Sequence, residues 1–275
     1  MALSKILPAS QEQYVGARNF IINGNFSVWQ RNTDSETTST SWAYRTVDRF
    51  QINRGRYRKT SDTVDGRTVD VVQIDPASGA YHGGRGMFTK IEDYNVYDKP
   101  TVLSVYVKAD AATTAEIGQL YDYGGGSTVQ AGTSVNITTD WQRFEVQYSA
   151  QTFSQAAANY IVNALVDGRT YYVAMAQLEE GTQATPFEHE SYGDTLLKCQ
   201  RYFELCGFIT RTDNLLDAVD YKVEKRAQSS IAIVSSDASG LTCGLNEHRD
   251  SRQGFYQNSN ASHTTRATIS SDAEL

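Results

Sequence analysis

Apolar and polar residues alternate along most of this chain, and the two-residue period constrains its fold more than any other feature. In residues 103–108 (LSVYVK) the aliphatic side chains fall on one face, and residues 143–148 (RFEVQY) repeat the pattern with aromatic anchors. Successive side chains of a strand point to opposite faces, so both segments are predicted to be half-buried antiparallel strands. The same reasoning predicts strands at residues 18–22, 69–74, 160–166 and 171–178.

Turn residues separate these predicted strands and indicate how they connect. Asp167 and Gly168 stand between the last two strands, which is a strong signal for a hairpin. Short strands divided by turns rich in Gly, Ser and Asp favour a sandwich or jelly roll, and 275 residues suffice for one large β domain or two smaller ones. No period of about 20 to 50 residues recurs, which disfavours a solenoid or β-helix.

One helix is predicted to interrupt the strands. Asp194 is the candidate N-cap, and Gly207 is the candidate residue that ends the helix. Apolar residues recur at helical spacing between them, namely Leu196, Cys199, Phe203 and Cys206. Shorter and more polar strands are predicted after the helix, at residues 221–227, 231–234, 241–245, 254–257 and 266–269.

These patterns together predict an all-β fold class. A jelly-roll β-sandwich (residues 18–190) is followed by a short helical linker (residues 191–207) and a smaller C-terminal β domain (residues 208–275). The segment from Met1 to Ala17 has little periodicity and contains Pro8, so residues 1–17 are predicted to form an N-terminal docking arm.

Charge, cysteine content and hydropathy restrict the functional classes. The formal net charge of -7 gives no electrostatic support for nucleic-acid binding. The three cysteines, Cys199, Cys206 and Cys243, form neither a disulfide framework nor a zinc site, and are predicted to be buried small hydrophobes. No signal peptide is visible, and no apolar run approaches the roughly 20 residues that a membrane span requires, so no membrane insertion is predicted.

Residues suited to catalysis do not fall into a recognisable pattern, and no enzymatic activity is predicted. Glu179 and Glu180 are adjacent carboxylates, but neighbours on a strand point to opposite faces and cannot flank one glycosidic bond. No Gly-x-Ser-x-Gly elbow and no His-x-x-x-His pair occurs. The histidines are scattered without ligand spacing, at His82, His189, His248 and His263.

Three segments carry a family resemblance. They are NFIINGNFSVWQR (residues 19–31) with YRTVDRF (44–50), KPTVLSVYVKAD (99–110) with DWQRFEV (140–146), and AQLEEGTQATPFEHESYGDTLLKCQRYFE (176–204). Together they resemble tail-fibre and related virion proteins of tailed phages that carry a carbohydrate-binding-module-like jelly roll. The third segment is the most specific. Asn32 and Val47 stand where Gly and Ala are common in the family, and His189 with Glu190 replaces its usual basic pair.

The resemblance implies a non-enzymatic virion protein, made in the host bacterial cytoplasm. Its expected role is that of a tail fibre or receptor-binding component that attaches to a host surface glycan or envelope structure. It also implies a homotrimer, and contacts with other virion proteins through the arm from Met1 to Ala17. Two alternatives stay open: a capsid fibre, head decoration or tail-assembly protein that binds other virion proteins, and a polysaccharide depolymerase.

Sugar binding requires exposed aromatic rings beside hydrogen-bonding groups, because sugar C–H faces stack on rings while the hydroxyls need partners. The candidate ligand-binding residues lie in or beside loops: Trp42, Tyr44, Tyr81, Tyr121 and Tyr123. The alternative is that these rings pack in the core or in a subunit interface. Trp29 and Trp141 are predicted to be core residues, and residues 32–41 and 122–133 are predicted to be long polar loops.

A structural calcium ion is the one cofactor considered, since jelly-roll carbohydrate modules often carry one. Asn23 or Asn25 near the start of the predicted domain, and Glu179 near its end, are candidates to supply the hard oxygen ligands that calcium prefers. No other metal or cofactor is predicted.

Overall fold

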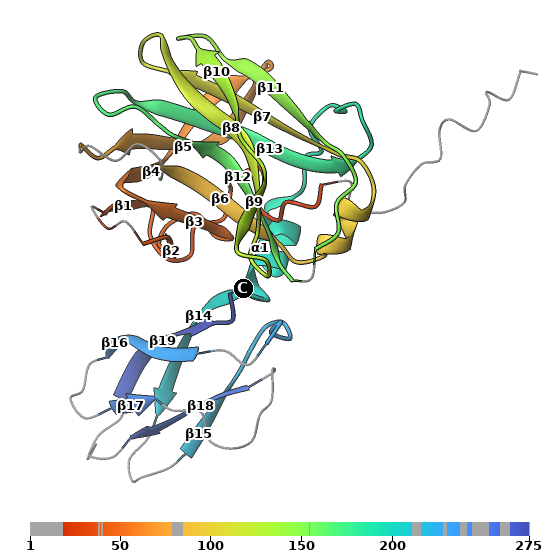
Figure 1. Cartoon of the computed structure of the whole chain (residues 1–275). Helices are drawn as coiled ribbons and strands as arrows, with labels where there is room; N and C mark the ends of the chain where they lie inside the picture. Colours follow the sequence, from red (N-terminus) through yellow and green to blue (C-terminus); the bar gives the residue numbers. More distant parts are fainter. Residues whose placement is uncertain are drawn as a thin grey trace, which may run out of the picture.

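The computed structural model describes residues 19–37, 39, 41–78, 85–153, 155–210, 216–227, 230–236, 241–243, 253–258 and 265–274. The predicted arm, residues 1–17, and the candidate Tyr81 lie outside these ranges. The predicted all-β class is confirmed: the described strands pair antiparallel, two sheets pack face to face as a jelly-roll β-sandwich, and a short α-helix lies at one end of it (Figure 1).

The first sheet, sheet A, has the strand order β1-β4-β5-β13-β7-β11. Its strands are β1 (Asp34–Thr37), β4 (Gly55–Val64), β5 (Arg67–Pro76), β7 (Thr101–Ala109), β11 (Gln142–Tyr148) and β13 (Tyr171–Glu180).

The second sheet, sheet B, has the order β10-β8-β12-β6-β3-β2, with β9 also paired to β8. Its strands are β2 (Ala43–Tyr44), β3 (Phe50–Asn53), β6 (Gly86–Ile91), β8 (Thr113–Asp122), β9 (Ser127–Gln130), β10 (Thr133–Ile137) and β12 (Ala157–Asn163). A 3-10 helix, η1 (Tyr94–Asp98), follows β6.

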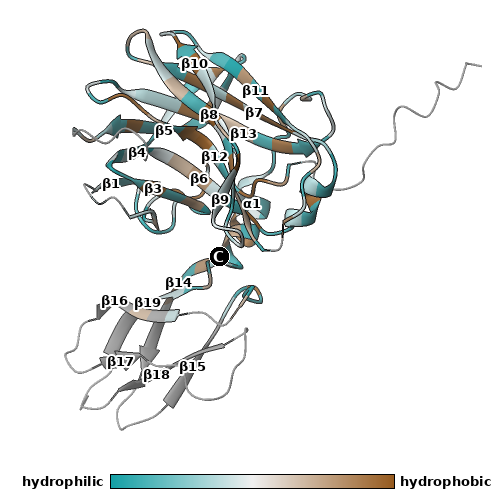
Figure 2. Cartoon of the chain, in the orientation of Figure 1, coloured by the Kyte–Doolittle hydropathy of each residue, from teal (hydrophilic) through white to brown (hydrophobic). Residues whose placement is uncertain are grey.

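The hydrophobic core lies between the two sheets. Alternate residues of β7, such as Leu103, Val105 and Val107, are fully buried there, and Ile117 of β8 meets them from sheet B. The strands accordingly alternate between hydrophobic and hydrophilic residues in Figure 2. Removal of this apolar area from water is the main force that holds the sheets together.

Five sequence predictions for this region were wrong in detail. The Asp167-Gly168 turn does not close a hairpin, because β12 belongs to sheet B and β13 to sheet A. Residues 21–25 form a bend and turn instead of a strand, although the Phe20 amide donates to the Leu178 carbonyl. The two predicted polar loops contain the short strands β1 and β9. Trp141 lies outside the main core, in a second cluster on the outer face of sheet A. Short edge strands carry few apolar residues, so their pattern is weak in the sequence.

The second cluster shows that the β4–β5 hairpin folds over the outer face of sheet A. Val64 and Val71 of the hairpin are fully buried against Ala174 and Met175 of β13. Asp62 of β4 accepts hydrogen bonds from Lys108 of β7 and from the Trp141 indole. Because β5 and β13 separate β4 from β7 within the sheet, these contacts require the hairpin to curl across that face.

The helix is shorter than predicted. α1 (Tyr192–Gln200) begins after Ser191, whose hydroxyl accepts from the Asp194 amide, so Ser191 is the N-cap instead of Asp194. Phe203 and Cys206 lie in strand β14 (Phe203–Thr210), which pairs with β19 (Thr265–Asp272). Apolar residues spaced three or four apart fit a helix, but pairing with a distant strand satisfies the backbone here.

The C-terminal strands form two small sheets beyond one end of the sandwich (Figure 1). One has the order β14-β19-β16, with β16 at Ser230–Ser236, and the other the order β15-β18-β17. Strands β15 (Leu216–Asp220), β17 (Leu241–Cys243) and β18 (Gln253–Asn258) make up the second. Residues 221–227 form bends and irregular structure, so the strand predicted there was wrong. The domain limits stay a prediction.

The end of the chain packs against the sandwich through buried charges. The Glu274 carboxylate pairs with Arg49 and, at 3.2 Å, with Arg31. The Arg49 guanidinium lies 3.5 Å from the centroid of the Tyr202 ring, and that of Arg31 lies 3.7 Å from the centroid of the Phe203 ring. The guanidinium groups thus receive both a carboxylate and an aromatic face, which offsets the loss of water around them.

The segments that carry the resemblance to virion proteins also meet in the structure. The Asn19 side chain donates to the Ala176 carbonyl and accepts from the Leu178 amide, at 2.9 and 3.0 Å. The Gln30 amide donates to the Phe203 carbonyl at 2.8 Å. These contacts give the motifs an architectural role. In the described part of the chain, no helix is long and apolar enough to cross a membrane.

Candidate ligand-binding face

The outer face of sheet B carries the candidate site. Met87 and Ile91 of β6 point into the core, so the alternate residues Phe88 and Lys90 point away from it. In the strand register, Tyr160 of β12 lies opposite Phe88 on one side and opposite Gln119 of β8 on the other. Sheet B therefore presents a row of side chains that do not belong to the main core.

Five aromatic rings on this side of the sandwich form one connected cluster, here called the aromatic face: Trp42, Phe88, Tyr121, Tyr123 and Tyr160. The Trp42 ring lies 4.9 Å from Phe88 and 5.4 Å from Tyr160, centroid to centroid. Phe88 lies 4.8 Å from Tyr160 and 6.1 Å from Tyr123, and Tyr123 lies 5.4 Å from Tyr121. These separations are typical of aromatic pairs in contact.

The rings differ in depth, which gives the face a floor and a rim. Phe88 is fully buried beneath its neighbours, whereas Tyr123 has 37% of its surface exposed. Trp42, Tyr121 and Tyr160 are partly exposed. A ligand would therefore contact tyrosine and tryptophan rings that are held in place from below by Phe88.

The turn between β8 and β9 positions the Tyr123 side chain. The Tyr123 amide donates to the Ala156 carbonyl, and the Gly124 amide donates to the Asp122 carboxylate at 2.8 Å. Gly126 has a φ of 66°, a conformation that favours glycine. The glycine-rich segment is therefore a structured turn that brings the Tyr123 ring over the sheet.

Tyrosine hydroxyls accumulate at the aromatic face and stay protonated. Burial raises the pKa of Tyr123 to about 12, assisted by the nearby Tyr44 and Tyr121. Burial also raises the pKa of Tyr44 to about 12, and the Tyr44 hydroxyl lies beside Gln51. Neutral hydroxyl groups both donate and accept hydrogen bonds, as sugar hydroxyls do.

The structure brings together four of the five residues predicted from the sequence. Trp42, Tyr121 and Tyr123 belong to the aromatic face, and Tyr44 lies at its border. Phe88 and Tyr160 were missed because they are apolar residues within strands, where the sequence alone does not tell the core face from the outer face.

Solved structures similar to this chain include carbohydrate-binding modules. The CBM22-1 xylan-binding domain from Paenibacillus barcinonensis is 17% identical, with a TM-score of 0.38, over 55% of this chain and 91% of that chain. A C-terminal family 22 carbohydrate binding module from Clostridium thermocellum is 16% identical, with a TM-score of 0.40, over 55% and 100%. A putative sugar binding protein from Bacteroides thetaiotaomicron has the same identity and TM-score over 59% and 100%.

Each of these TM-scores is below 0.5, so the likenesses assign neither a family nor a ligand to this chain. No family model matches the sequence, and no curated protein matches it either.

The residues considered for calcium are engaged with protein groups. Asn23 donates to the Val28 and Asp48 carbonyls, and Asn25 accepts from Ser27. Glu179 accepts from the Thr185 amide and hydroxyl, both at 2.7 Å. Within the described ranges, no group of three His, Cys, Asp or Glu residues is arranged to hold a metal ion. These side chains thus brace the sandwich, and the calcium prediction gains no support from them.

The adjacent carboxylates of β13 point to opposite sides, as predicted. Glu179 is buried and bound to Thr185, whereas Glu180 is exposed and pairs with Lys99 at 2.8 Å. They therefore do not face a common substrate.

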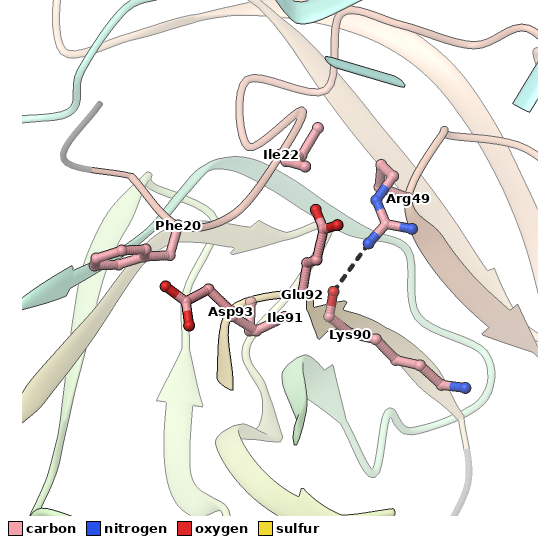
Figure 3. Close-up of a pocket in the computed structure, with 7 residues that line it drawn as sticks. All are labelled: Phe20, Ile22, Arg49, Lys90, Ile91, Glu92 and Asp93. Carbon is pink, nitrogen blue, oxygen red and sulfur yellow. Dashed lines mark hydrogen bonds between the residues drawn. The ribbon is translucent and has the colours of Figure 1, made fainter. Parts of the chain in front are cut away.

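A small cavity lies between β6 and the segment that follows Asn19 (Figure 3). Its volume is about 130 Å³, room for a few water molecules. Seven residues line it: Phe20, Ile22, Arg49, Lys90, Ile91, Glu92 and Asp93. In Figure 3 the Lys90 side chain points away from the cavity, while its carbonyl accepts from Arg49 at 3.0 Å. The cavity is too small for an oligosaccharide.

Proposed function

We propose that this chain is a non-catalytic carbohydrate-binding protein that holds a glycan on the outer face of sheet B. The observation that carries the proposal is the aromatic face: partly exposed rings of Trp42, Tyr121, Tyr123 and Tyr160 on one sheet, with protonated hydroxyls among them. Pyranose rings stack on such platforms, and hydroxyl groups fix their orientation.

Binding of purified protein to an array of microbial surface polysaccharides tests this function. We expect selective retention of a subset of glycans, with loss of the signal in Tyr123→Ala. A folded protein that binds no glycan on the array would contradict the proposal. Release of sugar from purified capsule by the isolated protein would instead favour a depolymerase.

We further propose that the glycan belongs to a bacterial surface and that the chain works as an attachment component of a tailed-phage particle, as a homotrimer. Its support is the resemblance of residues 19–31 and 176–204 to virion proteins. Imaging of particles with this chain labelled distinguishes a tail position from a capsid fibre or head decoration. Particles that lack the chain should adsorb poorly to host cells; normal adsorption would contradict the attachment role.

A further inference from the structure

A glutamine of β8 points to the same side of sheet B as the aromatic face. Ile117 and Leu120 both point into the core, so the two-residue alternation is interrupted between them. The interruption falls at Gly118, whose φ of 72° favours glycine. As a result Gln119 points outward, and Tyr121 follows it on the same face two positions later.

Gln119 therefore lies beside two rings of the aromatic face. In the register of sheet B it is opposite Tyr160 of β12, and it precedes Tyr121 on β8. Side chains that face each other across antiparallel strands have Cβ atoms about 5 Å apart. Because Gln119 is partly exposed, a sugar that stacks on Tyr160 or Tyr121 would bring its hydroxyl groups to this amide.

Two hydrogen bonds hold the Gln119 amide in place. Its oxygen accepts from the Asn163 side-chain nitrogen at 3.0 Å, and its nitrogen donates to the Thr128 hydroxyl at 3.2 Å. Asn163 is almost fully buried, whereas Thr128 is exposed. A side chain that is fixed before binding loses less conformational entropy when a ligand arrives.

The amide keeps the capacity for further hydrogen bonds. A primary amide has two N–H donors and an oxygen with two lone pairs. Within the described part of the chain, Gln119 uses one N–H for Thr128 and one lone pair for Asn163. One donor and one lone pair are left for a ligand. Hydroxyl groups on two neighbouring sugar carbons match them, because one accepts from the N–H while the other donates to the oxygen.

We propose that Gln119 is a specificity-determining residue of the aromatic face and selects sugars with two adjacent free hydroxyl groups. The pyranose ring stacks on Tyr160 or Tyr121, and its hydroxyls bind the Gln119 amide. Sugars that carry substituents on these hydroxyls lack the donor and bind less tightly. This inference rests on the proposed glycan-binding function and adds the feature of the glycan that the site recognises.

Methylation of a polysaccharide gives a matched pair of probes. The polysaccharide with the strongest array signal is titrated calorimetrically in its native form and after partial conversion of its hydroxyls to methyl ethers. Methyl ethers keep the sugar rings but cannot donate hydrogen bonds. We expect the wild-type protein to bind the native form about tenfold more tightly, since two hydrogen bonds contribute about that much.

Variants of the amide and of its tether locate the preference. Gln119→Leu should bring the ratio of native to methylated affinity close to one. Effects of the methyl groups on stacking act on both proteins and cancel in this comparison. Gln119→Glu should keep most of the preference, because a carboxylate still accepts from sugar hydroxyls and from Asn163. Thr128→Val removes the exposed tether and should weaken binding of the native form about threefold without changing the melting temperature.

Gln130→Leu is the matched control. It makes the same substitution on the neighbouring strand β9, but Gln130 lies opposite the core residue Leu120 and donates to the Gln147 carbonyl of sheet A. Its side chain therefore points away from the aromatic face. The affinity and the preference of this variant should stay those of the wild type.

The outcomes separate this inference from the function on which it rests. A ratio of native to methylated affinity that is the same in Gln119→Leu as in the wild type would overturn the role of Gln119. If Gln119→Leu does not fold because Asn163 loses its partner, an unchanged affinity in Thr128→Val decides against the proposal. In either case, loss of binding in Tyr123→Ala would still support glycan binding. Absence of binding to every glycan would contradict the proposed function as well.

Discussion

Arg49 and Glu274 are 225 positions apart in the sequence, yet they form an ion pair in which both side chains are almost completely buried. Loss of one partner from a buried pair leaves the other charge without compensation, which typically costs about 3–5 kcal/mol. The pair therefore makes the packing of the final residues on the sandwich sensitive to a single carboxylate.

Glu274→Ala should lower the free energy of unfolding by about 3 kcal/mol, because Arg49 loses its buried partner and Arg31 loses one of its three carboxylate partners. Urea-induced unfolding, followed by tryptophan fluorescence, measures this change. Arg56→Ala is the matched control, since it breaks an ion pair with Asp34 in which both side chains are more than 40% exposed. Its stability should be almost unchanged, and equal losses in the two variants would contradict the structural role of Glu274.

Tyr123→Ala should weaken glycan binding about tenfold, because it removes the most exposed ring of the aromatic face. Calorimetric titration gives the affinity, and thermal melting shows that the fold is retained. Tyr192→Ala removes a tyrosine that is 58% exposed on α1 and should leave the affinity unchanged. A wild-type affinity in Tyr123→Ala would exclude this ring from the binding surface.

The buried carboxyl group of Asp48 should make the free energy of unfolding depend on pH in an unusual way. Burial raises its pKa to about 6, against the opposing effect of Arg31. The folded state therefore binds the proton more tightly than the unfolded state, so this group's contribution to stability falls as the pH rises from about 4 to 6.

Asp48→Asn cannot ionise, so its free energy of unfolding relative to the wild type should rise by about 2 kcal/mol between pH 4 and pH 7. Urea titrations at pH 4, 5, 6 and 7 measure the difference between the two proteins. A difference that does not change with pH would show that Asp48 has an ordinary pKa.

Gly24→Ala should destabilise the protein by about 2 kcal/mol or more, because the added Cβ would lie 2.1 Å from the Ala176 carbonyl oxygen. The sequence suggests a turn glycine here, but its φ is not positive, and close approach to β13 is the actual requirement. Gly193→Ala, in the first turn of α1, places its Cβ 3.9 Å from the Ser191 hydroxyl oxygen, an ordinary contact, and should be neutral or slightly stabilising. Similar melting temperatures for the two variants would contradict this explanation.

Asp62→Ala should release the β4–β5 hairpin without unfolding the sandwich, since it removes the acceptor for Lys108 and Trp141. Hydrogen exchange should accelerate in residues 62–70 and stay unchanged in β7 and β8. The bond from Lys108 lowers the pKa of Asp62, so the contact contributes at neutral pH and is lost as the pH falls below about 4. Exchange that rises equally in all strands would indicate global destabilisation instead.

Local alternation was enough to predict the central strands of the sandwich. Residues 103–108 and 143–148 lie within β7 and β11. The turn at Asp167-Gly168 was predicted correctly, but it leads from β12 in sheet B to β13 in sheet A and closes no hairpin. Local sequence patterns failed to predict the structure where pairing with a distant strand determines it. Phe203 and Cys206 fit a helix by spacing, but β19 draws them into a strand from more than 60 positions away.

The candidate site could be predicted only in part for a related reason. Trp42, Tyr121 and Tyr123 stand out as aromatic residues near turns, whereas Phe88 and Lys90 join them through strand register alone. Which of two apolar residues in β6 faces the core depends on how that strand pairs with β12 and β3, and no short stretch of sequence contains that information.

The curl of the β4–β5 hairpin over sheet A has a consequence for the proposed glycan binding. Because the chain's own residues occupy that side, the outer face of sheet B is the one to which we assign the proposed glycan site. In the proposed role, each chain would make one shallow contact with a glycan, and firm attachment would depend on avidity. Several copies held side by side raise the apparent affinity by factors of about 10² to 10⁴ without any new contact, provided that their faces point the same way.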